Sequence, residues 1–186
     1  LTIRAVDGRA VLLADGEHAE GKAIWVIRNG DFVVDGFDFV GARVPDRNGA
    51  GIRFERGHLV VRQSKFLGNE SGILTGNHPG SELLVEACEF AANGHGDGQS
   101  HALYAGRMAG LEVRSSHFRQ GRVGHLLKSR ARVSRILYNR LTDEAGGRAS
   151  YELEFPNGGN LTVIGNLIEQ AATTENPAMV AVGAER

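Results

Sequence analysis

One apolar residue recurs every 23 to 28 positions along most of this 186-residue chain, and this period limits the folds open to it more than any motif does. The members of this column are Phe39, Phe66, Phe90, Phe118, Leu141 and Ile168. Five positions before each member stands a β-branched residue, in the order Val34, Val61, Val85, Val113, Ile136 and Val163. Self-similarity at this period is typical of repeat architectures in which each turn of the chain stacks on the next. The period therefore predicts a solenoid.

Further columns indicate that the repeats are built from strands. Seven positions before each member of the first column stand Phe32, Leu59, Leu83, Leu111, Ser134 and Leu161. Residues separated by an even number of positions on a strand share one face. Two positions before each member stand mostly small or polar residues that suit a tight bend, namely Phe37, Ser64, Cys88, Ser116, Asn139 and Asn166. A less regular strand is predicted in each repeat at 24–27, 51–54, 72–75, 102–104, 125–128, 151–155 and 179–182.

Each repeat thus holds about three short strands and has no room for a crossover helix, so strands of successive repeats must pair in parallel. The predicted fold is an all-β, single-stranded, right-handed parallel β-helix of about six to seven coils of 23–28 residues. It forms one domain over residues 1–186, which we expect to be a piece of a longer chain because Leu1 begins directly in strand register. A β-sandwich would show turn signals but no columns at the length of a coil.

The composition limits the classes of partner that this chain can bind. The formal net charge of −1 creates no global field for nucleic acid or an anionic membrane, although a local positive patch could hold an acidic glycan. No run approaches the ~20 apolar residues of a membrane span. Cys88 is the only cysteine, so no intramolecular disulfide is predicted. We therefore expect neither a nucleic-acid partner nor a membrane span.

Alternation along the strands predicts a charged outward face. Glu152 and Glu154 flank a leucine that we expect in the core, so both carboxylates should point outward. One coil earlier, the same argument places Leu126, Lys128 and Arg130 outward. Stacked strands lie ~4.8 Å apart, which would bring the two cations close to the two carboxylates.

This cluster has the residue types needed to remove a proton alpha to a carboxylate. A lysine near other cations, here Lys128, can act as base while Arg130 neutralises the carboxylate. His101, His125 or Tyr104 could protonate the leaving oxygen, which completes the β-elimination of a uronic-acid polysaccharide. We therefore expect an acidic polysaccharide as partner. The same residues could instead form a surface ladder of ion pairs worth ~0–1 kcal/mol each.

The loop with the pattern Asn93-x-His95-x-Asp97 offers oxygen and nitrogen atoms, but its spacing matches no established zinc or calcium motif. We interpret it as a flexible loop rather than a metal site. The sequence assigns no cofactor with certainty, and calcium stays open as one. Loops of unequal length can wall a groove beside a solenoid face. The residues expected to contact substrate are His95, Asp97, His125, Asn157 and Arg53.

Several segments carry a family resemblance. The whole chain resembles the right-handed β-helix proteins grouped with pectate lyases, and 48–53, 124–131 and 150–159 resemble a group of bacterial β-helix repeat proteins. This resemblance implies a secreted or periplasmic location. The segment Leu127-Lys128-Ser129 is similar to the Asn-Lys-Ser segment of the chondroitinase B and alginate lyase family, which implies that Lys128 is the base. The family's Leu-Arg-His-Gly segment, which supplies the acid, has no counterpart around 154–158.

Three classes of function follow. The first is a polysaccharide lyase or a glycan epimerase using Lys128, Arg130, His101 and Tyr104. The second is a glycoside hydrolase that pairs Glu152 with Glu154, whose carboxyls would lie ~6–7 Å apart on one strand, or that uses Asp97. The third is a module that binds glycans or proteins without catalysis. The same scaffold hosts all three.

The first and last coils of the predicted solenoid would expose strand edges. Strand edges at the first and last coils stay exposed unless a cap covers them, and residues 184–186 are too few to form one. We expect end-to-end association through these coils or further capping segments.

Overall fold

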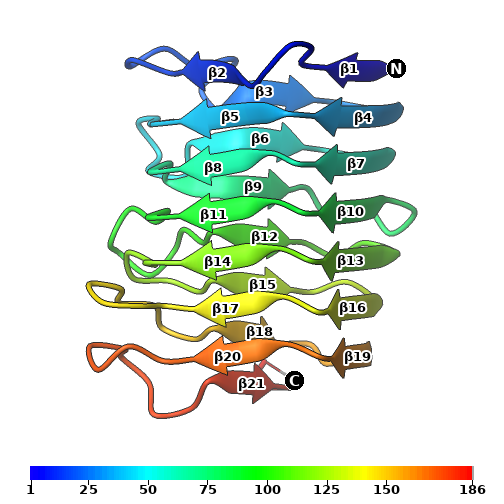
Figure 1. Cartoon of the computed structure of the whole chain (residues 1–186). Coiled ribbons are helices and arrows are strands. Elements are labelled where there is room, and N and C mark those ends of the chain that lie inside the picture. The colour runs from blue at the N-terminus through cyan, green and yellow to red at the C-terminus, as the bar shows by residue number, and fades with distance from the viewer. Residues whose placement is uncertain (186) are drawn as a thin grey trace.

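Three parallel sheets run the length of the molecule, and every turn of the chain contributes one strand to each of them (Figure 1). The computed structural model describes residues 1–185; Arg186, the last residue of the segment expected to be too short for a cap, lies outside the described residues. All elements of residues 1–185 are strands, and the three sheets have seven strands each. The prediction of an all-β parallel β-helix is confirmed, with about seven coils.

The sheets are named A, B and C in the order in which each coil passes through them. Sheet A consists of β1 (Thr2–Arg4), β4 (Asp31–Asp35), β7 (His58–Arg62), β10 (Glu82–Glu86), β13 (Gly110–Arg114), β16 (Val133–Leu137) and β19 (Asn160–Ile164). Sheet B consists of β2 (Ala10–Leu13), β5 (Phe37–Val40), β8 (Lys65–Leu67), β11 (Glu89–Ala91), β14 (His117–Arg119), β17 (Arg140–Thr142) and β20 (Leu167–Glu169). Sheet C consists of β3 (Ala23–Ile27), β6 (Ala50–Phe54), β9 (Ser71–Thr75), β12 (Leu103–Ala105), β15 (Leu127–Ser129), β18 (Leu153–Phe155) and β21 (Val180–Val182).

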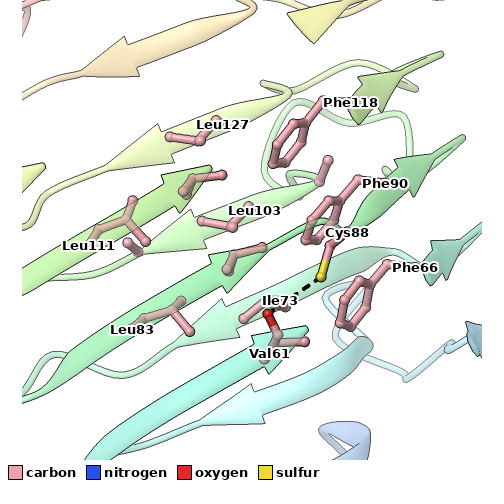
Figure 2. Packing of buried hydrophobic residues seen from close by; sticks show 14 of the residues in the cluster. Val61, Phe66, Ile73, Leu83, Cys88, Phe90, Leu103, Leu111, Phe118 and Leu127 are labelled. Atoms are coloured by element: carbon pink, nitrogen blue, oxygen red, sulfur yellow. Dashed lines mark hydrogen bonds between the residues drawn. The ribbon is translucent and has the colours of Figure 1, made fainter. Parts of the chain in front are cut away.

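The apolar columns seen in the sequence are the inward faces of sheets A and B. Along sheet B the paired residues are Phe39, Phe66, Phe90, Phe118, Leu141 and Ile168. Both predicted columns of sheet A are likewise in register. The four phenylalanine rings stack with centroids 5.1, 4.7 and 4.5 Å apart and nearly parallel planes, and Figure 2 shows three of them. Stacking of identical residues is thus the main organising contact of the core.

Sheet C approaches this phenylalanine stack closely because its facing positions are small. A Cβ atom on Gly51 would lie 2.7 Å from Phe66 Cδ1, and one on Gly72 would lie 2.7 Å from Phe90 Cδ1. Such distances are too short for a carbon–carbon contact, so the stack requires glycine at both positions.

The corner between sheets A and B is held by side chains that hydrogen-bond from coil to coil. The backbone N–H of Cys88 donates to Ser116 Oγ, and that of Ser116 donates to Asn139 Oδ1. The N–H of Asn139 donates in turn to Asn166 Oδ1. Cys88 Sγ donates to the Val61 carbonyl oxygen at 3.5 Å (Figure 2), and burial raises the pKa of this thiol to about 12. The predicted turn column is confirmed, with an inert cysteine in it.

The two ends of the solenoid leave apolar side chains uncovered. In the first coil Val11 and Leu13 are 63% and 66% exposed, and in the last coil Leu167 and Val182 are 54% and 55% exposed. End-to-end association through these coils stays a prediction. Within residues 1–185, no helix has the length and apolar character needed to cross a membrane.

Candidate functional site

The outward side of sheet C carries a column of polar side chains over three adjacent strands. Tyr104 on β12 pairs in register with Lys128 on β15, which pairs with Glu154 on β18. Their leucine neighbours on the same strands are fully buried in the core. Because neighbours on a strand alternate, the three polar side chains lie on the side away from the core.

Glu154 is the most shielded charge in this column, with 6% of its side chain exposed. Its Oε2 lies 2.8 Å from Lys128 Nζ and 2.8 Å from His125 Nε2. Burial alone would raise the pKa of Glu154, but the contacts with His125 and Lys128 outweigh it and lower the pKa to about 2. The carboxylate is therefore ionised at neutral pH.

Arg130, which follows β15 directly, contacts three other side chains of the site. Its Nε donates to the Tyr104 hydroxyl at 3.0 Å, and its Nη1 donates to Asn157 Oδ1 at 2.8 Å. Its Nη2 lies 2.7 Å from Oε2 of Glu185, and Lys128 Nζ lies 3.6 Å from Oε1 of the same carboxylate. The structure thus gathers the predicted Tyr104, Lys128, Arg130 and Asn157, and adds Glu185, which the sequence analysis missed.

Aromatic rings line the side of the site where the chain enters sheet C. The His101 and His125 rings stack with centroids 4.6 Å apart, Tyr104 lies 5.7 Å from His101, and Tyr151 lies 5.3 Å from His125. Burial, together with nearby positive charge, lowers the pKa of His101 well below its usual value, so this ring is neutral at pH 7. Because His101 Nδ1 accepts the backbone N–H of His125 at 3.0 Å, the ring proton resides on Nε2.

Glu152 does not share the outward face with Glu154, so that expectation was wrong. Its side chain is completely inaccessible to solvent. Leu126, at the same position one coil earlier, was also expected to point outward and is likewise fully buried in the core. The column that contains them begins with Gly51 and Gly72, which face the phenylalanine stack. On later coils Leu141 and Ile168 replace the opposing phenylalanine rings, and larger side chains in this column fill the space. Two successive side chains therefore face inward where the chain bends into sheet C, and the two-residue alternation of a strand fails there.

The interior position leaves Glu152 without a partner. Neither carboxylate oxygen has a hydrogen-bond partner among residues 1–185. Burial, reinforced by the nearby charge of Asp143, raises the pKa of Glu152 to about 7. Glu152 and Glu154 therefore do not share one face, as a hydrolase that pairs these two carboxylates would require.

Three predicted substrate residues have other contacts. His95 Nδ1 lies 3.2 Å from Oε1 of Glu70, a buried carboxylate that also accepts two backbone N–H groups and so holds the loop of the preceding coil. Asp97 accepts a backbone N–H within its own loop. Arg53 pairs with the glutamate two residues further on. A substrate role for His95, Asp97 and Arg53 stays a prediction.

Two hollows lie elsewhere on the molecule. A cavity of about 450 Å³ over the outward side of sheet A is floored by Val60 and Leu84, and one of about 290 Å³ opens among apolar side chains of the first coil. Neither is lined by a residue of the sheet C cluster. Residues 1–185 hold no group of three or more side chains suited to bind a metal ion.

Comparison of the chain with protein-family models, with curated proteins and with solved structures gives no match. The resemblance to pectate lyases and to the chondroitinase B family therefore stays a prediction, and the site must be interpreted from its own chemistry. It offers two cations, a tyrosine hydroxyl, a neutral histidine and an ionised glutamate within one cluster. Such a set can bind a carboxylate and move a proton next to it.

Proposed function

We propose that the outward face of sheet C binds a uronic-acid polysaccharide and cleaves it by β-elimination. The observation that carries this proposal is the convergence of Lys128, Arg130 and Tyr104 over adjacent strands, with Arg130 Nε only 3.0 Å from the Tyr104 hydroxyl. A sugar carboxylate and the acidic proton on the neighbouring carbon would meet cations and a proton-transfer group at the same place.

The chemistry assigns a role to each group. Lys128 and Arg130 neutralise the carboxylate, which stabilises the enolate formed when the C5 proton leaves. Tyr104 acts in its phenolate form, which the hydrogen bond from Arg130 stabilises, and its oxygen takes that proton to become a neutral phenol. The electron pair of the C5–H bond forms the C4–C5 double bond, the C4–O bond breaks, and Tyr104 returns the proton to the leaving oxygen.

Lys128 is placed here as an electrostatic group and not as the base. Its Nζ lies 2.8 Å from Oε2 of Glu154, whose pKa is lowered to about 2, so the two groups form an ion pair. The ion pair suits charge stabilisation better than proton abstraction. Glu154 and His125 then act by holding the ammonium group in position.

Epimerisation is the closest variant of this reaction, because it shares the first proton transfer and returns a proton to the opposite face of the same carbon. A second candidate function is a glycan-binding module without turnover. The ion pairs of Lys128 and Arg130 with carboxylates favour it, since these cations can hold an acidic sugar by exchanging one carboxylate for another without any chemistry.

The test is to incubate the protein with alginate, chondroitin, hyaluronan and pectate, with and without calcium, and to follow the ultraviolet absorbance of the new C4–C5 double bond. We expect product from at least one polymer, and rates at least ~100-fold lower for Tyr104→Phe and Lys128→Ala. Lys65→Ala is the matched control, because Lys65 Nζ pairs with Glu89 at 3.0 Å on the outward face of sheet B and should not affect the rate.

The outcomes separate the candidates. Binding of a polymer without double-bond formation would favour the glycan-binding module, or an epimerase if proton exchange with deuterated water is seen by NMR. Absence of both binding and turnover on every polymer would contradict the proposal.

A further inference from the structure

The segment that follows β21 folds back onto the candidate site. The backbone N–H of Gly183 donates to the Phe155 carbonyl oxygen at 2.9 Å, and that of Glu185 donates to the Pro156 carbonyl oxygen at 3.0 Å. These two bonds lay the segment along the turn that leaves β18. The side chain of Glu185 therefore lies beside Lys128 and Arg130, the two cations on the coil of β15.

The Glu185 carboxylate is held by both cations of the site. Arg130 Nη2 lies 2.8 Å from Oε1 and 2.7 Å from Oε2, and Lys128 Nζ lies 3.6 Å from Oε1. Asn157 Nδ2 donates to the Glu185 backbone oxygen at 3.5 Å, while Asn157 Oδ1 accepts from Arg130 Nη1 at 2.8 Å. A guanidinium beside an ammonium is a common arrangement for carboxylate recognition.

We infer that Lys128, Arg130 and Asn157 form a carboxylate-binding subsite, and that Glu185 is its internal occupant, which the carboxylate of a uronic-acid substrate must displace. The identification of that ligand as a uronate rests on the proposed function. The subsite itself rests on the carboxylate already bound there.

The exposed fractions of the three charged side chains show that Glu185 is the one that can leave the subsite. The side chains of Lys128 and Arg130 are only 12% and 15% exposed, and each has a further partner in Glu154 or Tyr104. The Glu185 side chain is 49% exposed. Contacts with the Arg130 guanidinium lower the pKa of Glu185, so it is charged at neutral pH and competes with other anions. Because ion pairs open to solvent are weak, the occupant can be displaced readily.

Glu185→Gln tests this inference, with Glu175→Gln as matched control. Glu175 is an exposed carboxylate of the same coil that makes none of the ion pairs of the site, so its variant carries the same change in net charge. Calorimetry with saturated oligomers of mannuronate and of galacturonate, in a Tyr104→Phe background to prevent turnover, should show Kd about five-fold lower for Glu185→Gln. The control should bind as the parent does.

A second probe keeps the subsite testable apart from the polysaccharide. Sodium acetate, followed by the NMR signal of Arg130 Nε, should shift that signal at lower concentration in Glu185→Gln than in wild type. If no oligouronate binds but acetate behaves as expected, the proposed function fails and the subsite stands.

Two results would overturn the inference. One is that Glu185→Gln binds both oligouronate and acetate no better than the wild type. The other is that, with Tyr104 intact, Glu185→Gln loses turnover while Kd is unchanged, because Glu185 would then take part in the reaction.

Discussion

Sheets B and C each carry a lysine–glutamate pair of similar length on the outward face, but the two pairs lie in different surroundings. On sheet B, Lys65 Nζ lies 3.0 Å from Glu89 Oε2, and the side chains are 39% and 24% exposed. On sheet C, Lys128 Nζ lies 2.8 Å from Glu154 Oε2, and the exposures fall to 12% and 6%. Glu89 has a second cationic partner, Arg119 from the next coil.

The difference shows that stacked coils form some ion pairs simply because of their geometry, without any function. Residues at equal positions on neighbouring coils face each other, so alternating charges form exposed ladders such as that of sheet B at little cost. Shielding both members of a pair from water costs more, and the pair is a weak source of stability. The sheet C pair is shielded where histidine, tyrosine and arginine also converge, and this combination identifies it as the candidate site.

The largest expected effect comes from removing the two lysines in turn. Lys128→Met should lower the free energy of unfolding by roughly 3 kcal/mol, because the Glu154 carboxylate would stay buried after losing the ammonium group 2.8 Å from its Oε2. Lys65→Met should cost less than about 1 kcal/mol, because Glu89 can be hydrated and keeps Arg119. Urea denaturation at pH 7 measures both, and equal losses would remove the distinction between the sheets.

The contributions of Glu152 and Glu154 to stability should change with pH in opposite directions. The pKa of Glu152 is about 7 in the folded protein against 4.5 when unfolded, so its contribution to stability is present below pH 4.5 and is lost as pH rises to 7. The pKa of Glu154 is about 2 in the folded protein, so this residue contributes stability above pH 4.5 that is lost as pH falls to 2.

Glu152→Leu isolates the first of these. It should raise the unfolding free energy by up to about 3 kcal/mol at pH 8 and by much less at pH 4.5, because an uncharged side chain replaces a buried carboxylate. Leu126 occupies the same ladder position one coil earlier, so leucine is expected to fit. Urea denaturation at both pH values is the measurement, and a gain independent of pH would show that packing rather than charge is responsible.

The smallest effect concerns salt. A double-mutant cycle on Lys65 and Glu89 should give a coupling of about 0.5 kcal/mol that disappears at 1 M NaCl, where screening acts over about 3 Å. The cycle on Lys128 and Glu154 should retain most of its coupling, because salt screens shielded charges poorly. Equal salt sensitivity of the two couplings would contradict the assigned burial.

Much of the fold could be predicted because its contacts repeat. Phe66 and Phe90 occupy equal positions in their coils, so a column in the sequence is a ladder in the structure. β2 was missed because its apolar residues fall before the first aromatic member of the column. The alternation argument placed Lys128 and Glu154 rightly, since both lie inside regular strands.

The rest of the site depended on irregular parts of the coil. Glu152 precedes β18 at a bend, where two successive side chains face inward and the two-residue period fails. Glu185 meets Arg130 across a sequence separation of 55 residues, from a segment outside any strand. No periodicity links such positions, so only the three-dimensional path of the chain brings them together.

The stacking of the coils has a consequence for motion. The groups of the candidate site come from three adjacent coils, since Tyr104 lies on β12, Lys128 on β15 and Glu154 on β18. In a solenoid each coil is stabilised mainly by its neighbours, so local opening of one of these coils separates the groups of the site. The order of the site is therefore set by the least stable of these three coils, which amide hydrogen exchange of β12, β15 and β18 would identify.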